Sequence, residues 1–154
     1  MPRLSSYLGV WVRHGSWYPD RILRLFDRER GRWAGRDPHP APAVDGSVGR
    51  LAGDLLHHPY ADLSEHLAKI DDYTSTMASE LFAAGKRAGA ADLVLRPAMR
   101  FLRFYLLDRG FLLGWRGLLL SCLAAHYGRL KYAKLLALQA GADGGCERPP
   151  PPAD

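Results

Sequence analysis

The sequence predicts an α+β fold in which a half made of short strands and loops precedes a helical half. Residues 1–60 are rich in Gly, Pro, Trp and Arg, and short apolar runs alternate there with turn sequences. From Asp62 onward, apolar residues recur at helical spacing. The 154 residues, 47% of them hydrophobic, suffice for the core of one ordinary domain.

The apolar runs of residues 1–60 are GVWV, RILRLF, RWAG and VGRLAGDLL, and turn sequences such as PD, RGR, DPHPAPA and DG separate them. Each run has the length of one short strand. A few short strands need a larger sheet or covering helices to be stable. We therefore expect residues 1–60 to be the end of a sheet whose beginning lies outside this sequence.

The first expected helix begins at Asp62, which together with Glu65 three residues later has the pattern of a capping box, and Gly85 ends it. Its expected apolar face consists of Leu63, Leu67, Ile70, Met77 and Leu81.

Two further helices are expected within residues 61–140. One starts near Asp92, is broken or restarted at Pro97 and reaches Gly110, and the other covers roughly residues 115–139. Residues 141–154 have the composition of a disordered tail.

Cys122 and Cys146 give neither a disulfide framework nor a metal-binding spacing, so a reducing compartment such as the cytoplasm is expected. The first residues lack the sustained apolar run of a signal peptide, so none is expected.

The chain carries 21 Lys and Arg against 16 acidic residues, a formal charge of +5, which favours anionic partners such as phosphates, nucleic acid or acidic lipid. Its aromatic and arginine residues do not follow the pattern of an RNA-recognition motif or a recognition helix, so a nucleic-acid partner is not expected. The sequence also contains neither GxGxxG nor GxxxxGK[ST]. If a nucleotide binds, another segment must hold most of it.

The segments LSSYLGVWVRHGSWYPDRILRLFDRERGRWAGRDPHP and VDGSVGRLAGDLLHHPYADLSEHLAKIDDYTS resemble the C-terminal half of family 2 glycosyltransferases of the lipopolysaccharide-core type. The resemblance runs from about Leu4 to about Gln139. It implies a GT-A fold in which a nucleotide-sugar-binding half, carrying the metal-binding aspartates, precedes this segment. Residues 1–60 would then be the acceptor-side remainder of the catalytic domain, and the enzyme would use Mg²⁺ or Mn²⁺.

In that family, the loop at the position of RHGSWYPD lines the donor and acceptor pocket. The resemblance implies that Trp17 and Tyr18 stack on a sugar or control access for the acceptor, and that Asp20 anchors hydroxyl groups. The alternative is that Trp17 packs in the core and that Pro19 and Asp20 only form a turn.

The GRDPHP loop, residues 35–40, resembles the place where the family carries its catalytic carboxylate, often as a histidine followed by an acid. That acid deprotonates the acceptor hydroxyl. Here Pro40 follows His39, which leaves Asp37 as the nearest carboxylate. Either Asp37, two residues before His39, takes this role, or catalysis is impaired. The other interpretation is that Asp37 and Pro38 only form a turn.

The resemblance places His57 near the metal-bound diphosphate, where a neutral imidazole suits a divalent ion and a protonated one a leaving phosphate. The alternative is a structural histidine on a strand. On a strand, His58 would point to the opposite side, so the two histidines would not chelate together. Arg24 is a candidate to bind phosphate, whereas Arg21 is more typical of a solvated strand face.

Residues 100–138 mix large apolar residues with cations, and no uncharged run reaches the roughly 18 residues of a membrane-spanning helix. This composition fits helices that lie in the interface of an anionic membrane, at the inner face of the cell membrane, where a lipid-linked acceptor is found. The alternative is packing of these helices on each other or on the catalytic domain.

Three functions remain open, of which one, a nucleic-acid binder, is suggested only by the charge of +5. The first is a glycosyltransferase fragment that transfers a sugar from a nucleotide-diphosphate sugar to a lipopolysaccharide-core or related envelope glycan, with its donor-binding half absent. The second is a non-enzymatic membrane-peripheral module that keeps only the basic amphipathic helices.

Overall fold

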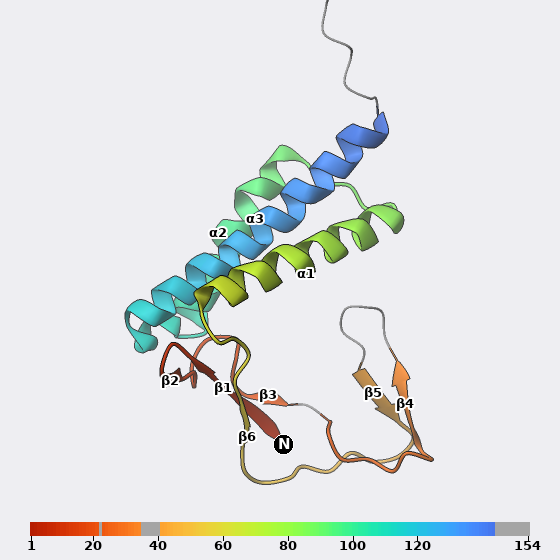
Figure 1. Ribbon diagram of the computed structural model, residues 1–154, viewed down its shortest axis with the longest axis vertical. Helices are drawn as coiled ribbons and strands as arrows, with labels where there is room; N and C mark the ends of the chain where they lie inside the picture. The colour runs from red at the N-terminus through yellow and green to blue at the C-terminus, as the bar shows by residue number, and fades with distance from the viewer. Residues whose placement is uncertain (22, 35–40, 144–154) are drawn as a thin grey trace, which may run out of the picture.

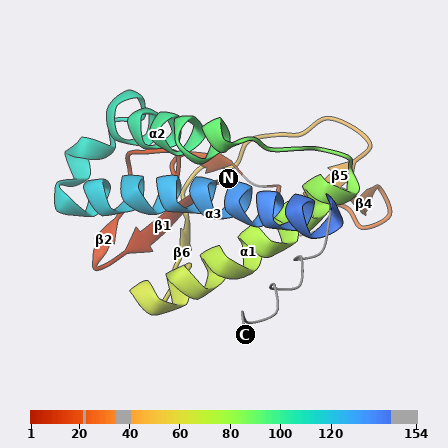
Figure 2. The same cartoon turned by 90° about the horizontal axis from the view of Figure 1, so that it is seen from above.

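In the computed structural model, which describes residues 1–21, 23–34 and 41–143, three α-helices lie over a layer of short strands (Figure 1). Seen from above, α3 lies between α1 and α2, and it packs against both (Figure 2). This mixture of short strands followed by helices agrees with the predicted α+β class.

Strand β1, Pro2–Tyr7, organises the main sheet of four strands. It pairs antiparallel with β2, Val10–Trp11, and with β3, Asp20–Arg21, and parallel with β6, Leu55–His57. The parallel pair sets Ser5 opposite His57, across more than fifty residues of sequence. The sheet therefore brings the start of the chain, the segment ending at Arg21 and the GDLLHH segment together.

The strand predictions for this half were only partly correct. GVWV contains β2 and RWAG overlaps β4, Gly31–Ala34. The described residues of RILRLF form no strand after Arg21, and VGRLAGDLL contributes only its end, where β6 follows Gly53 with its positive φ of 84°. β1 was not predicted at all.

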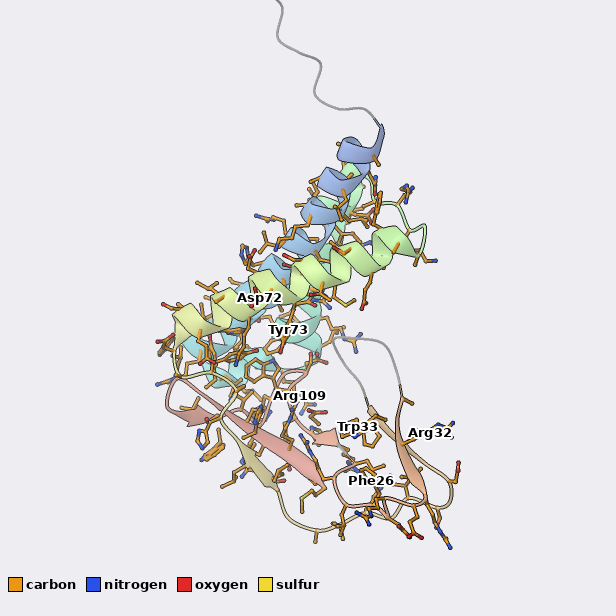
Figure 3. All side chains as sticks on the ribbon, turned by 45° about the vertical axis from the view of Figure 1, so that its right-hand side comes forward. Phe26, Arg32, Trp33, Asp72, Tyr73 and Arg109 are labelled. Atoms are coloured by element: carbon orange, nitrogen blue, oxygen red, sulfur yellow. The ribbon has the colours of Figure 1, made fainter. Side chains whose placement is uncertain are left out.

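The second sheet is the antiparallel pair of β4 with β5, Ala41–Val44, and it stands to one side of the main sheet (Figure 1). The end of DPHPAPA, assigned above to a turn, forms β5. Trp33 of β4 is two-thirds exposed and lies near Phe26 in Figure 3.

Helix α1, Leu63–Ala83, begins as predicted. The Asp62 carboxylate accepts a hydrogen bond from the Glu65 amide at 2.8 Å, and the Glu65 carboxylate accepts one from the Ala61 amide at 2.6 Å. After the helix, Gly85 takes a positive φ of 72°, which confirms the predicted end.

The predicted apolar face of α1 was only partly correct: of its five residues Ile70 alone is buried and Leu67 is exposed. The buried stripe consists of His66, Ile70, Thr74 and Ala78. The two polar members tolerate burial because they have partners. His66 Nδ1 lies 2.9 Å from the Tyr7 hydroxyl, and Thr74 Oγ1 accepts a hydrogen bond from Lys134 at 3.0 Å.

The second helical region consists of a 3₁₀ turn η1, Ala90–Leu93, helix α2, Leu95–Leu102, a π-helical turn η2, Arg103–Leu107, and a 3₁₀ turn η3, Gly110–Leu113. Pro97 lies in the first turn of α2, where its missing amide breaks no helical hydrogen bond. This agrees with the predicted restart of the helix at Pro97.

Helix α3, Trp115–Asp143, confirms the third predicted helix and continues beyond its expected end, so residues 141–143, predicted to belong to a disordered tail, are helical. Lys134 of α3 donates to the Asp71 carbonyl and carboxylate and to the hydroxyls of Thr74 and Ser75, at 2.6–3.0 Å, and so ties α3 to α1. Arg116 donates to the carbonyl of Leu8 at 2.9 Å, which ties α3 to the strand layer.

One hydrophobic cluster spans the strand and helix layers. Its buried members are Tyr7, Val12, Ile70, Phe104, Leu120 and Leu123. The assignment of residues 1–60, 61–140 and 141–154 to separate functional regions stays a prediction.

Candidate functional site

A cavity of about 690 Å³ lies between the main sheet and the helices, and we call it the interlayer cavity. Its walls come from β1, the RHGSWYPD loop, β6, and helices α1, α2 and α3. Three residues predicted as site residues line it: Trp17, Asp20 and His57. Tyr73 also lines it, from α1, and Figure 3 shows this side chain on the side of α1 that faces the strands.

Four rings form an aromatic cluster at the wall of this cavity: Tyr7, Trp17, Tyr60 and His66. The rings of Tyr60 and His66 stack with centroids 4.0 Å apart, and Trp17 meets Tyr7 edge to face at 5.5 Å. Trp17 is half-buried, packs against the core cluster and also lines the cavity, so both interpretations given for it above hold.

Burial sets the protonation states within the aromatic cluster. It raises the pKa of Tyr7 to about 12, with a smaller contribution from Tyr60. It lowers the pKa of His66 to about 4, and the nearby Lys69 cation adds to this shift. His66 is therefore a neutral ring and Tyr7 a neutral phenol at physiological pH.

The charged residues that line the interlayer cavity are mostly cations: Arg3, Lys69 and Arg100, against the single acid Asp20 among the described lining residues. Arg3 and Asp20 form an ion pair of 2.5 Å. The Nε of Arg3 is buried and makes no hydrogen bond with a described residue. Lys69 pairs with Glu65 at 2.7 Å and lies over the Tyr60 ring at 5.1 Å.

His57 and His58 point in different directions, as expected for neighbours on a strand. His57 lines the cavity, whereas His58 lies 2.6 Å from the Ser6 hydroxyl and contacts the Trp11 ring. Burial is the main cause that lowers the pKa of His57, followed by the cations Arg3 and Arg24. His57 is thus a neutral imidazole that can donate or accept a hydrogen bond.

The described residues do not by themselves fit a metal ion. Among them, no group of three or more His, Cys, Asp or Glu side chains is placed to hold one. The charges that act most strongly on His57 are those of Arg3 and Arg24, and their positive charge disfavours a metal cation beside this imidazole. A divalent metal stays an expectation for a complete enzyme.

The RHGSWYPD loop is held by the connection between α2 and α3. Asp108 accepts a hydrogen bond from the Gly15 amide at its carbonyl, 2.7 Å, and from the Ser16 hydroxyl at its carboxylate, 2.7 Å. Gly15 has a positive φ of 78°, and a Cβ there would overlap the Phe104 ring. The helical region therefore determines where Trp17 lies.

The other predicted site residues lie elsewhere. Tyr18 and Arg24 line a second cavity of about 920 Å³, between the segment that follows β3 and residues 44–54. The Tyr18 hydroxyl donates to Asp54 at 3.1 Å, so Tyr18 and Trp17 do not form one stacking platform. Asp37 and His39 lie outside the described residues.

Sequence reasoning missed several residues of the interlayer cavity, above all Arg3, Tyr60 and His66. One signal was available, because a histidine and a threonine in the buried stripe of α1 indicate polar groups with specific partners. The approach of Tyr7 to His66, 59 positions apart, has no local sequence signal.

No helix in residues 1–21, 23–34 and 41–143 combines the length and the apolar character needed to cross a bilayer. No protein-family model matches the chain, and no solved structure is similar to it. A curated protein is similar: "Lipopolysaccharide core biosynthesis glycosyltransferase LpsC" from Rhizobium meliloti (strain 1021), 30% identical over 117 residues.

The chain is related to a glycosyltransferase. The similarity covers 75% of this chain and 43% of LpsC, so the chain matches less than half of that relative. Since most of LpsC has no counterpart here, LpsC supports the general class of enzyme, and the sugar, the acceptor and the mechanism are matters for proposal.

Proposed function

We propose that this chain is the acceptor-side part of a family 2 glycosyltransferase with a GT-A fold, and that its interlayer cavity binds a saccharide. One observation carries the proposal. Trp17 and Asp20 of the RHGSWYPD loop and His57 of the GDLLHH segment were selected from the sequence alone, and they line one cavity although about forty positions separate Trp17 from His57. The relation to LpsC gives the class of reaction.

The composition of the cavity suits a sugar. The rings of Trp17 and Tyr73 line the cavity and offer apolar surface to the face of a pyranose, whereas Tyr60 already stacks on His66 and Arg100 lies over Tyr127. Ser5, Ser16, Asp20 and His57 offer donors and acceptors for hydroxyl groups. Its volume of about 690 Å³ lies within the range of small-molecule sites.

In the proposed reaction, an acceptor hydroxyl attacks the anomeric carbon of a nucleotide-diphosphate sugar and a base takes the hydroxyl proton. The bond from the anomeric carbon to the diphosphate oxygen breaks, and the nucleoside diphosphate leaves. Asp37, beside His39 in the GRDPHP loop, is the proposed base. The interlayer cavity holds the acceptor, and His57 at its wall hydrogen-bonds substrate. The donor is held mainly by a preceding half, as the lack of a phosphate-binding glycine motif in this chain suggests.

The acceptor and location follow from the same proposal. LpsC is named for lipopolysaccharide core biosynthesis, so the proposed acceptor is a lipid-linked core or related envelope glycan. Such an acceptor is built at the cytoplasmic face of the inner membrane. The proposed enzyme is therefore cytoplasmic and peripheral to that membrane, and Mg²⁺ or Mn²⁺ is its proposed cofactor.

Exchange of segments with LpsC tests this function. We expect LpsC to keep sugar transfer to the lipopolysaccharide core when its matching segment is replaced by this chain, because the acceptor site is retained. The measurement is core transfer in a Rhizobium meliloti strain that lacks LpsC. In the exchanged protein, Asp37→Asn should lower transfer by about 10²–10⁴-fold, the contribution of a positioned base.

Glu29→Gln, a carboxylate-to-amide change at an exposed residue outside the GRDPHP loop, is the matched control and should leave transfer unchanged. A folded exchanged protein without transfer would contradict the proposed function. Equal transfer by the Asp37→Asn variant would remove Asp37 from the mechanism.

A further inference from the structure

Helix α2 and the turns that follow it expose an unusual amount of apolar surface. Residues 94–118 contain ten exposed large hydrophobic side chains, more than half of those in the described residues. They are Val94, Leu95, Met99, Leu102, Leu106, Leu107, Phe111, Leu112, Trp115 and Leu118. Contiguous surfaces of this kind mark contact with another protein or with a membrane.

The exposed residues form a regular stripe on one side of the helix. Leu95, Met99, Leu102 and Leu106 are spaced by four, three and four residues, which places them on a single helical face. Met99 is 68% exposed and Leu95 61% exposed. The stripe continues at the α2–α3 connection through Phe111, Leu112 and Trp115.

The opposite side of α2 already packs in the fold. Pro97 and Phe104 are buried, and Arg100 lies over the Tyr127 ring of α3 at 5.1 Å. Figure 2 shows α2 at the edge of the helical layer, with α3 on one side of it only. The protein itself therefore covers the side opposite the stripe, and the described residues leave the stripe uncovered.

Arginines accompany the stripe. Residues 94–118 contain five arginines and one acid, Asp108. Arg100 and Arg116 contact groups within the fold, the Tyr127 ring and the Leu8 carbonyl. Arg96 and Arg103 lie along one flank of the stripe with 56% and 75% of their side chains exposed, and Arg96 also pairs with Asp92. Asp108 already binds Ser16 and lies 3.9 Å from Arg103, so the exposed surface is apolar and positively charged.

We propose that this face, which we call the α2 face, lies on an anionic lipid bilayer, with Leu95, Met99, Leu102 and Leu106 in the interface and the arginines at the lipid phosphates. An apolar stripe bordered by arginines is the pattern of an interfacial helix. A second copy of this chain is a poorer partner, because a symmetric contact would place the arginines of both copies together.

The structure also narrows the membrane prediction made for residues 100–138. Lys134 and Arg116 bind groups within the fold, so they are structural cations. The proposed membrane-contacting surface is formed by α2, η2 and η3. Most of α3 packs on the opposite side of α2 and would not contact the membrane. The proposal does not depend on the enzymatic function, because it concerns a different surface from the interlayer cavity.

Flotation of the 154-residue chain with vesicles tests the proposal. We expect binding to phosphatidylcholine vesicles that contain phosphatidylglycerol, weak binding to phosphatidylcholine alone, and loss of binding at high salt. Leu102→Glu with Leu106→Glu should weaken binding at least about tenfold, because two charges enter the apolar stripe. Arg96→Gln with Arg103→Gln should weaken binding to anionic vesicles by about 30-fold and leave binding to neutral ones unchanged.

Leu67→Glu with Leu138→Glu is the matched control, since both leucines are exposed helical residues outside the α2 face. This variant should bind like the unmodified chain. Absence of binding to anionic vesicles by a folded chain, or equal binding by the Leu102→Glu, Leu106→Glu variant, would overturn the proposal. Self-association without lipid that the same variant abolishes would overturn it too, by showing that a second copy covers the face.

Discussion

Replacing Gly117 with alanine is expected to destabilise the fold by about 3 kcal/mol. Gly117 is buried in the first turn of α3, where a Cβ would overlap the carbonyl oxygen of Gly110 and lie 3.1 Å from Cβ of Leu113. The clash involves backbone atoms, which a change of rotamer does not relieve. The two segments would have to separate, and the turn η3 would move away from α3. Urea denaturation gives the difference in free energy of unfolding.

Gly141→Ala is the matched control for this change. Gly141 lies in the same helix, and a Cβ there meets nothing within 4 Å. Alanine favours helix over glycine, so this variant should be as stable as the unmodified chain or more stable, by up to about 1 kcal/mol. Equal effects of the two substitutions would show that α3 does not approach Gly110 this closely.

Acidification from pH 7 to pH 4 is expected to lower the free energy of unfolding by about 2–3 kcal/mol through His66 alone. Burial lowers the pKa of His66 from 6.5 to about 4 in the folded state. Between these two values the unfolded chain binds more protons than the folded chain, so stability falls as the pH falls. This contribution is fully present above pH 6.5 and is lost as the pH drops to about 4. Denaturation midpoints across this range measure the effect.

His66→Gln removes the titrating group, so the difference in stability between the unmodified chain and this variant should itself depend on pH in this window. Protonation of carboxylates such as Glu65 at low pH lowers the free energy of unfolding of both proteins equally, so this contribution cancels in the comparison. His126→Gln, at an exposed histidine of α3, is the control for the substitution of a histidine by glutamine. Parallel pH profiles for the unmodified chain and His66→Gln would contradict the burial of a neutral imidazole.

The helices were predictable from sequence because their signals are local. Asp62 and Glu65 cap α1, Gly85 ends it, and the interaction of each with the backbone involves residues at most four positions away. The strands were less predictable. β1 has the sequence PRLSSY, with little apolar alternation, and it is a strand because it pairs with β6 more than fifty residues later.

The site followed the same division. The resemblance selected Trp17, Asp20 and His57, and the fold brought them to one cavity. Sequence reasoning grouped Tyr18 with Trp17, but the two lie in the turn before β3, and Tyr18 meets Asp54 at another cavity. From the sequence, the region of α2 could be recognised only by its mixed apolar and cationic composition. The side of α2 that packs on α3 depends on tertiary structure, so the exposed stripe could not be predicted.

Calorimetric titration of the 154-residue chain with lipopolysaccharide-core oligosaccharides tests most directly whether the interlayer cavity is an acceptor site. The account predicts saturable binding without nucleotide, weakened about tenfold by Trp17→Ala through the lost ring contact. It predicts no change for Trp33→Ala, which removes an exposed indole far from this cavity. Absence of binding by a folded chain, equal affinity of the Trp17→Ala variant, or binding of nucleotide-diphosphate sugars in place of oligosaccharides would contradict it.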